Sequence, residues 1–245
     1  MQLAFREWDN SASAQRAAAA LGDDEVQLWI AEVPAAGVDL TPHFCLLSPD
    51  ERERAARFGV LEARRQFVFG RAFLRQLLGA CLRIDPAAVA LVYQPRGKPV
   101  VAQATAGKNL RFNLSHSGCL VAMALAWGRE VGVDIEQLQH LDDCELLAER
   151  IFSTRELCEL RALPKPLQQE AFFNGWTRKE AYLKATGEGL TDALPAIEVT
   201  LAPGKPPELL GLPVGPEAMR QWAIQAIPMP PGCVGAVVFE LAVRP

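Results

Sequence analysis

The chain has 245 residues, of which 50% are hydrophobic, and a formal net charge of −4. This composition excludes a disordered chain, a collagen-like repeat and a small disulfide-stapled domain, and the length suffices for one substantial core or two smaller ones. The slightly negative charge argues against general nucleic-acid binding. Arginines are concentrated over residues 51–83, however, and acidic residues over 130–160. Such segregation is typical of solvated faces, or of a site that binds both anions and a metal ion.

The first half of the sequence predicts two helices among short strands. Val26 to Ile30 reads as a strand, and Ser48-Pro49-Asp50-Glu51 combines an N-cap, a proline at the first helical position and a capping box. Apolar residues at helical spacing predict a long helix from Glu62 to Arg83. Further strands are expected at 90–93, 99–102, 111–114 and 119–126.

The second half begins with a strand over 131–136 and then turns helical. Ser153-Thr154-Arg155-Glu156 is a second capping box, and a long helix is predicted from Gln168 to Ala185, ended by Gly187 and Gly189. Closing strands are expected at 197–201, 222–227 and 234–243.

This order of elements predicts an α+β protein of two similar-sized lobes, residues 1–127 and 128–245. The longest apolar run, 119–127, is far shorter than the roughly 20 residues that cross a bilayer. Charged residues at 6, 7 and 9 stand where a signal peptide would be apolar. We therefore expect a soluble, cytoplasmic protein with neither a membrane nor a nucleic acid as partner.

Two carboxylates end the strand Gly132-Val133-Asp134-Ile135-Glu136. Because side chains alternate along a strand, Asp134 and Glu136 are predicted to share one face. Converging carboxylates on a rigid strand suit a hard divalent cation such as Mg²⁺. Taken alone, the pattern also fits a solvated strand end.

A second chemical feature is the helical segment Trp176-Thr177-Arg178-Lys179-Glu180-Ala181-Tyr182-Leu183-Lys184. At i, i+4 and i+8, Trp176, Glu180 and Lys184 form one stripe. The Glu180–Lys184 spacing is that of an ordinary helical ion pair, worth about 0.2–0.5 kcal/mol. The same residues also suit a third metal ligand with a phosphate-neutralising cation, and Lys179 lies beside them.

Two turns carry further cations. His116 lies among small hydroxyls in Asn113-Leu114-Ser115-His116-Ser117, where it would donate to an anion, although a lone loop histidine usually has no catalytic role. Lys98 lies in the turn Pro95-Arg96-Gly97-Lys98, which by itself predicts a polar hairpin tip.

The order of these motifs is more specific than any of them alone. The chain reads R-G-K-P, F-N-L-S-H-S, G-V-D-I-E, F-S-x-x-E and W-T-R-K-E-A-Y-L-K, with G-E-G-L behind. In this order it resembles the 4′-phosphopantetheinyl transferase superfamily, in particular the broad-acceptance bacterial branch that activates peptide and polyketide synthases. The resemblance covers about Leu47 to Leu190.

The resemblance implies a fold of two α/β lobes related by a pseudo-twofold axis, with coenzyme A in the cleft between them. It implies that Asp134, Glu136 and Glu180 bind Mg²⁺, with Mn²⁺ as a substitute. Lys184 matches the lysine that contacts the pyrophosphate.

Other positions match residues that hold the coenzyme. Lys179 is implied as a helper of Lys184, and Lys98 and His116 as contacts to the phosphates or the nucleotide end. The candidates for the 3′-phosphate are Arg52, Arg54, Arg65 and Arg71. Glu51 stands where some relatives carry a basic residue, which leaves open which of these arginines serve.

The implied reaction moves 4′-phosphopantetheine from coenzyme A to a serine of an acyl or peptidyl carrier protein and releases adenosine 3′,5′-bisphosphate, the activity of a holo-acyl-carrier-protein synthase. Glu180, or a water it holds, is the candidate acceptor of the serine proton, a role ranked below metal binding. We expect a monomer, since two lobes supply their own interface. Two alternatives remain open: a Mg²⁺-dependent phosphotransferase that uses a free nucleotide without a P-loop, and an inactive module that binds coenzyme A or a carrier protein.

Overall fold

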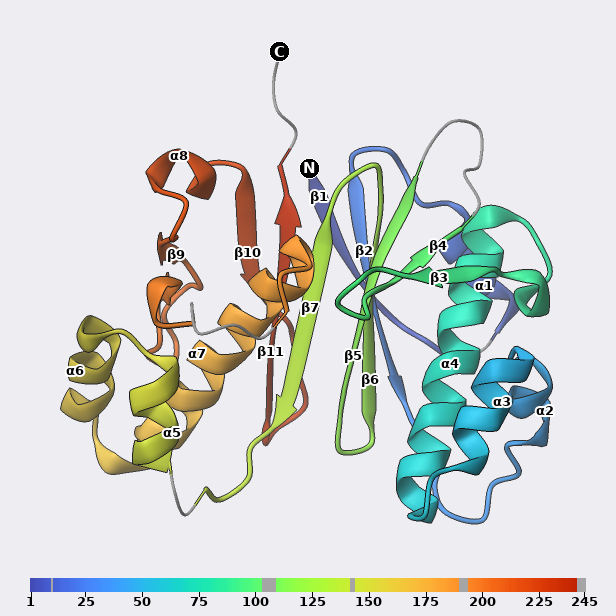
Figure 1. The fold of residues 1–245 in the computed structure, drawn as a ribbon, viewed down its shortest axis with the longest axis horizontal. Helices are drawn as coiled ribbons and strands as arrows, with labels where there is room; N and C mark the ends of the chain where they lie inside the picture. Colours follow the sequence, from blue (N-terminus) through green and yellow to red (C-terminus); the bar gives the residue numbers. More distant parts are fainter. Residues whose placement is uncertain (10, 103–108, 142–143, 190–193, 242–245) are drawn as a thin grey trace. The chain divides into compact units, whose positions relative to one another are not determined.

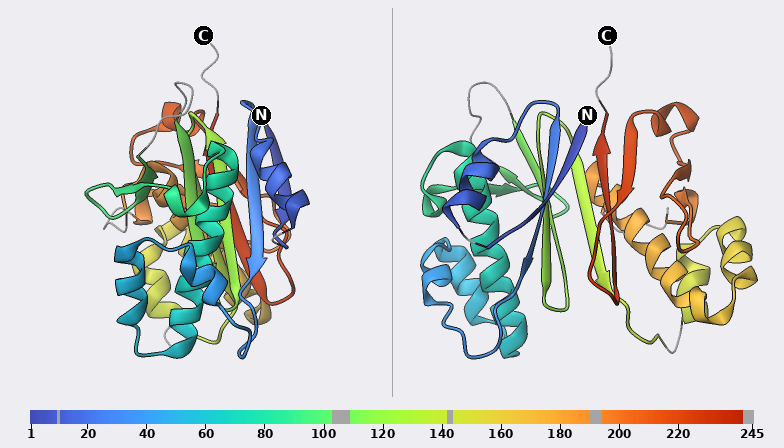
Figure 2. Two further views of the ribbon diagram at one scale, coloured as in Figure 1. Left: turned by 90° about the vertical axis from the view of Figure 1, so that its right-hand side faces the viewer. Right: turned by 180° about the vertical axis from the view of Figure 1, so that it is seen from behind.

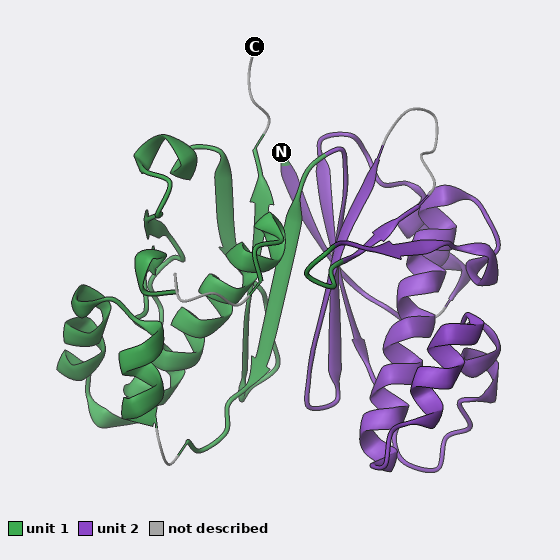
Figure 3. Ribbon diagram, in the orientation of Figure 1, with its two compact units in different colours: residues 1, 95–98, 129–245 green, residues 2–94, 99–128 purple. Residues whose placement is uncertain are grey.

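The computed structural model describes residues 1–9, 11–102, 109–141, 144–189 and 194–241 (Figure 1). The chain divides into two compact units (Figure 3). Residues 2–94 and 99–128 form what we call the N-terminal unit. Residues 129–245, joined by Met1 and by 95–98, form the C-terminal unit. The mixture of helices and sheets confirms the α+β class. The predicted division at 127/128 assigned residues 95–98 to the N-terminal lobe, whereas in the structure their contacts, described below, lie with the C-terminal unit.

The N-terminal unit is built on a four-stranded sheet of order β1-β2-β6-β5. The first two strands pair in parallel and the other neighbours are antiparallel. The strands are β1 (Gln2–Glu7), β2 (Glu25–Glu32), β5 (Leu110–Ser117) and β6 (Leu120–Trp127), and β3 (Leu91–Tyr93) and β4 (Pro99–Val101) form a separate hairpin.

The long helix α4 (Leu61–Leu82) packs its apolar side onto this sheet (Figure 2). Phe73 and Leu77 of the helix lie in one core cluster with Trp29 and Met123 of the strands. The unit also contains α1 (Ala12–Ala19), α2 (Thr41–Cys45), α3 (Pro49–Ala56) and the short η1 (Pro86–Ala88).

The C-terminal unit has a three-stranded antiparallel sheet of order β10-β11-β7. Its long helix α7 (Lys165–Thr186) packs against β7 and β11. The strands are β7 (Val131–Gln137), β10 (Trp222–Ala226) and β11 (Cys233–Glu240). Around them lie α5 (Cys144–Ile151), α6 (Thr154–Ala162), η2 (Leu194–Ala196), β8 (Glu198–Val199), β9 (Leu209–Gly211) and α8 (Pro216–Met219).

Most predicted elements are present, with revised ends. The predicted helix 168–185 begins earlier, at Lys165, because Pro166 fits the first helical turn, and it ends at Gly187, whose φ of 75° is left-handed. The predicted strand 197–201 shortens to β8. Of the predicted strand 234–243, residues 242–243 lie outside the described part. Within the described ranges, no helix combines the length and the apolar character needed to cross a membrane.

Because Gly132 has no side chain, the backbone of helix α7 packs directly against the backbone of strand β7. A Cβ atom at this position would lie 2.0 Å from Ala181 O and 2.4 Å from Ala185 N. Both distances are far below any real carbon contact, and the obstacles are backbone atoms of a packed helix. The close approach therefore requires glycine, and it sets the distance between α7 and the residues that follow on β7.

We predict that Gly132→Ala destabilises the protein severely, because helix and strand must separate to admit the methyl group. Overpacking typically costs about 1–3 kcal/mol, and a backbone clash should reach or exceed the upper end. The measurement is urea-induced unfolding. The matched control is Gly59→Ala, since a Cβ there meets nothing within 4 Å and φ is not left-handed. Equal stability of the two variants would contradict the proposed packing.

Candidate active site

Strand β7 directs two carboxylates toward helix α7. Gly132 faces the helix backbone, and alternation along the strand places Asp134 and Glu136 on the same face. Asp134 is 4% exposed, whereas Glu136 is half-buried near the end of the strand. The shared face predicted from the D-x-E spacing is therefore present.

Helix α7 brings a third carboxylate and a lysine to this face. Glu180 and Lys184 directly precede Ala181 and Ala185, the two residues whose backbone packs closely against Gly132. The ammonium of Lys184 lies 2.5 Å from Asp134 Oδ1, and Glu180 is 9% exposed. We call Asp134, Glu136, Glu180 and Lys184 the acidic cluster.

The electrostatics of the acidic cluster disfavour the charged form of Glu180. Burial is the main cause that raises its pKa to about 7, and the negative charge of Asp134 is the next. Glu136 adds a smaller effect in the same direction, while Lys184 opposes both. The buried Oε1 atom of Glu180 has no hydrogen-bond partner in the described part of the protein. An uncompensated carboxylate oxygen among like charges is a favourable place for a cation.

The acidic cluster has the donor chemistry of a Mg²⁺ site, since carboxylate oxygens are the ligands this ion prefers. Among the described residues, no three His, Cys, Asp or Glu side chains are already arranged to hold a metal. The ammonium of Lys184 instead lies against Asp134. The cluster therefore fits a divalent cation in charge and ligand type, and its side chains would have to close around one.

Lys98 joins the hairpin tip 95–98 to the C-terminal unit. Its ammonium donates to Ala185 O on α7 at 3.0 Å and pairs with Glu130 Oε2 at 3.2 Å. These contacts explain why residues 95–98 group with the C-terminal unit. They also place Lys98 within one helical turn of Lys184 along α7.

Lys179 points away from the acidic cluster. Its side chain is fully buried, and its ammonium lies 2.6 Å from Glu156 Oε2 of helix α6. Burial is the main cause that lowers the pKa of Lys179, and Glu156 opposes this effect. The prediction that Lys179 helps to hold the pyrophosphate is therefore wrong, because the ammonium has no exposed surface.

The N-terminal unit contains a cavity of about 490 Å³. Three residues predicted to bind the coenzyme line it, namely Arg54, Arg71 and His116. Both guanidinium groups lie near the ring of Phe67, that of Arg54 at 5.2 Å and that of Arg71 at 5.6 Å from the ring centre. A cavity that combines cations with an aromatic ring suits a phosphorylated nucleoside.

Arg71 is held by a buried charge network. Glu51 pairs with Arg75 at 2.7 Å, and its second carboxylate oxygen lies 3.8 Å from Arg71 Nη1. Arg75 also donates to the carbonyl of Val89 at 3.0 Å. Glu51 therefore lies beside Arg71 and pairs with Arg75. This pairing accounts for an acidic residue at a position where the resemblance led to the expectation of a basic one.

The other two predicted arginines do not line this cavity. The guanidinium of Arg65 donates to the carbonyls of Pro34, Ala35 and Val38, at 2.8–3.0 Å. Arg52 is exposed and donates to Cys45 O at 2.9 Å. Both therefore hold loops, whereas Arg54 and Arg71 line the cavity, and all four arginines stay candidates for the 3′-phosphate.

Comparisons with known proteins agree with both halves of this picture. A family model described as "4'-phosphopantetheinyl transferase superfamily" matches residues 130–237, which include the acidic cluster. A second, "4'-phosphopantetheinyl transferase, N-terminal", matches residues 37–127, which include Arg54, Arg71 and His116. The chain is 41% identical to the 4'-phosphopantetheinyl transferase HetI of Nostoc sp. over 87% of each chain. The chain belongs to the 4′-phosphopantetheinyl transferase superfamily.

Two other 4'-phosphopantetheinyl transferases are less similar and match a shorter part of the chain. The chain is 33% identical to psf-1 of Bacillus pumilus over 64% of each chain. It is 30% identical to Sfp of Bacillus subtilis strain 168, over 63% of this chain and 66% of Sfp.

The sequence did not point to Phe67 as a residue of the cavity, nor to the pairing of Glu51 with Arg75. Phe67 lies on the apolar stripe of α4 and was indistinguishable from a core residue. Glu51 fulfilled its capping role, accepting from Ser48 N at 3.0 Å, and so needed no second function. A signal was available in the helical spacing, because Phe67, Arg71 and Arg75 recur every four residues.

We predict that Glu180→Gln stabilises the metal-free protein at high pH. The folded protein raises the pKa of Glu180 above the ordinary value of 4.5, so it retains a proton that the unfolded chain has lost. Stability therefore falls as pH rises from about 4.5 to about 7, and the cost persists above that range. The Gln variant should match the wild type at pH 5 and melt a few degrees higher at pH 8, given about 2–4 °C per kcal/mol.

Thermal melts in a chelator at both pH values measure this effect. The control is Glu208→Gln, which changes an exposed side chain on the same unit and should show the same difference from wild type at both pH values. A Glu180→Gln variant that melts below the wild type at pH 8 would contradict the electrostatic account.

Proposed function

We propose that the protein transfers 4′-phosphopantetheine from coenzyme A to a serine of an acyl or peptidyl carrier protein, in a reaction that depends on a divalent cation. The observation that carries the proposal is the acidic cluster, in which the charges of Asp134 and Glu136 act on Glu180, whose buried Oε1 has no hydrogen-bond partner among the described residues. Similarity to HetI over most of both chains supports a transferase of that type. The second product is adenosine 3′,5′-bisphosphate.

Asp134, Glu136 and Glu180 would hold Mg²⁺, for which Mn²⁺ would substitute. The bound ion would supply Lewis-acid chemistry, neutralising charge on pyrophosphate oxygens. Lys184 has a half-buried ammonium beside this cluster, where it would stabilise negative charge that develops on the same oxygens. Lys98 stays a predicted phosphate contact, which would exchange its pairing with Glu130 for the phosphate.

The reaction forms one bond and breaks one. The serine Oγ of the carrier protein bonds to the phosphorus that carries pantetheine, and the bond from that phosphorus to the bridging oxygen breaks. The electron pair leaves with adenosine 3′,5′-bisphosphate. Glu180, or a water it holds, would accept the serine proton, a role secondary to metal binding because a carboxylate that holds the cation is a weaker base.

The cavity of the N-terminal unit would bind the nucleotide end of coenzyme A. Arg54 and Arg71 offer cations to the 3′-phosphate, His116 offers a ring N–H, and Phe67 offers an aromatic ring. Guanidinium groups bind phosphates well, because they donate several hydrogen bonds in a fixed plane. Such a site would favour coenzyme A over nucleotides that lack this phosphate.

We predict that the protein adds the mass of one phosphopantetheine to an apo carrier protein when coenzyme A and Mg²⁺ are present, and that Asp134→Ala lowers the rate by at least about 100-fold. The reason is that Asp134 supplies a ligand oxygen from a rigid strand. Mass spectrometry of the carrier protein measures the transfer.

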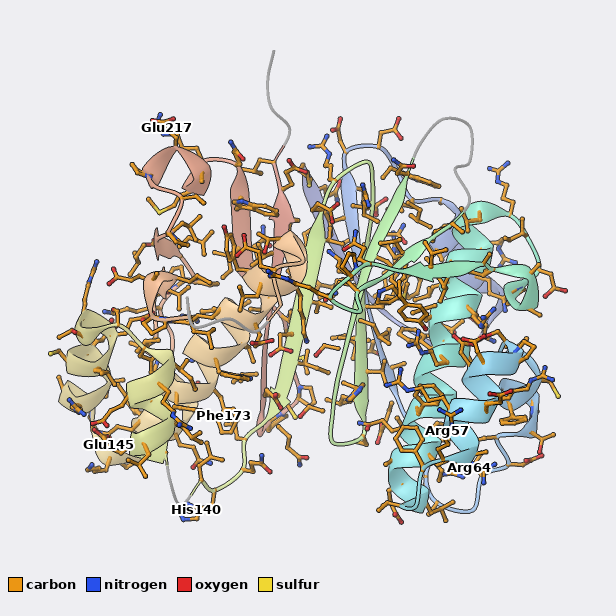
Figure 4. All side chains as sticks on the ribbon, in the orientation of Figure 1. Arg57, Arg64, His140, Glu145, Phe173 and Glu217 are labelled. Carbon is orange, nitrogen blue, oxygen red and sulfur yellow. The ribbon has the colours of Figure 1, made fainter. Side chains whose placement is uncertain are left out.

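The control is Glu217→Ala, an exposed carboxylate on α8 of the same unit (Figure 4), which should retain the wild-type rate. A folded Asp134→Ala variant with the wild-type rate would refute the metal role. A wild type that binds coenzyme A without modifying any carrier protein would favour the inactive binding module.

We predict that Arg71→Ala weakens binding of coenzyme A about 10-fold or more, but leaves binding of dephospho-coenzyme A nearly unchanged. Dephospho-coenzyme A lacks the 3′-phosphate, so a lost contact to that group cannot affect it; a charge-assisted hydrogen bond is worth about 1.5–3 kcal/mol. Isothermal titration measures both affinities. Arg57→Ala is the control, because Arg57 is exposed beside α3 (Figure 4) and outside the cavity lining. Equal weakening for both ligands would show that Arg71 does not recognise the 3′-phosphate.

A further inference from the structure

The most deeply buried charge pair of the C-terminal unit lies beside the acidic cluster in sequence, yet faces another direction. Lys179 of α7 and Glu156 of α6 have side chains that are 0% and 1% exposed. Their charged atoms are 2.6 Å apart. A buried ion pair is costly to desolvate, so its presence calls for a role other than surface solubility.

Every proton of the Lys179 ammonium has a protein acceptor. Besides Glu156, the ammonium donates to Ile151 O at 2.9 Å and to Leu194 O at 3.0 Å, and the ring of Phe152 lies 5.1 Å away. An ammonium has three donors and no more. Lys179 therefore has none left for a substrate phosphate.

Glu156 connects this lysine to further elements. Its Oε1 accepts from Val199 N of β8 at 2.9 Å, and its Oε2 accepts from Ser153 N at 2.8 Å as part of the α6 capping box. Through one ion pair, α7 is thus joined to the end of α5, to the start of α6, to η2 and to β8.

These contacts fix the rotation of α7 about its own axis. Consecutive residues of an α-helix point about 100° apart, so tethering Lys179 on one side determines where Glu180 points on the next. On the strand side, the close contact of Ala181 with Gly132 fixes the distance. The ion pair and the glycine together set both the angle and the depth at which Glu180 meets β7.

We propose that Lys179 and Glu156 are positioning residues, which hold α7 in the rotation that presents Glu180 and Lys184 to Asp134. The inference rests on the proposed function of the acidic cluster. It assigns Lys179 no contact with coenzyme A. If the proposal holds, activity does not require Lys179 once the buried charge of Glu156 is also removed.

The test compares Lys179→Met with the double variant Lys179→Met/Glu156→Gln. The single change leaves a buried carboxylate without its counter-ion, whereas the double change removes both charges and keeps an amide oxygen for Val199 N. The control is Lys205→Met, since Lys205 pairs with Glu159 at 3.7 Å on the surface of the same unit.

Three quantities are measured for each variant: the transfer rate constant kcat, the KM for coenzyme A, and the affinity for Mn²⁺ by isothermal titration. For Lys179→Met we expect kcat to fall about 100-fold, since misplacement of about 1 Å has this effect. Its Mn²⁺ affinity should fall too, with the KM for coenzyme A within about threefold of the wild type. The double variant should recover kcat and Mn²⁺ affinity to within about tenfold of the wild type, and Lys205→Met should match it.

Two results would overturn the proposal. A folded double variant as impaired as the single one, with a raised KM for coenzyme A, would show that Lys179 contacts the substrate. A single variant with normal kcat and Mn²⁺ affinity, but a lower melting temperature, would reduce the pair to a stabilising role. If Lys179→Met does not fold, recovery of activity in the folded double variant still decides between positioning and contact. Transfer by the wild type tests the proposed function separately.

Discussion

The approach of helix α7 to strand β7 at Gly132 is the constraint on which the candidate site depends. A helix ordinarily packs on a sheet through side chains, at a distance that would hold short carboxylates apart. Here the backbone of Ala181 and Ala185 takes the space of a missing Cβ. The consequence is that Asp134, on the same strand face, reaches the ammonium of Lys184 on the helix.

The close approach of these charged side chains has an electrostatic cost in the metal-free protein. Glu180 is buried beside the charge of Asp134, and both effects raise its pKa. Natural proteins tolerate such unfavourable clusters where a ligand relieves them, so the strain is itself evidence for a site. Lys184 offsets part of the repulsion in the metal-free protein, and under the proposed function the same ammonium would neutralise phosphate charge.

The sequence predicted those features that follow from a local period. Asp134 and Glu136 share a face because strand side chains alternate, and Glu180 and Lys184 lie together because a helix repeats every 3.6 residues. It failed where direction depends on tertiary contacts. Lys179 adjoins Glu180 in the chain but points about 100° away, into α6. The contacts of Arg65 with loop carbonyls were likewise not predicted. The helix α1 and strand β1 were missed, since an Ala-rich segment and an edge strand lack a marked pattern.

The two units nevertheless share one arrangement of side chains, although the sequence shows no convincing internal repeat. In each, a capping-box glutamate, Glu51 or Glu156, is buried and pairs with a cation on the long helix that follows, Arg75 or Lys179. Each cation also donates to a backbone carbonyl farther along the chain, that of Val89 in the first unit and that of Leu194 in the second. In each unit a residue that adjoins the pair along the chain or one helical turn away is a candidate for the proposed site. Arg71 lies one turn before Arg75, and Glu180 follows Lys179. A cap that first specifies where a short helix begins thus acquires a second task. The carboxylate oxygen that accepts the N–H of the cap residue also binds a cation on the neighbouring long helix, and this ties the rotation of that helix to the cap.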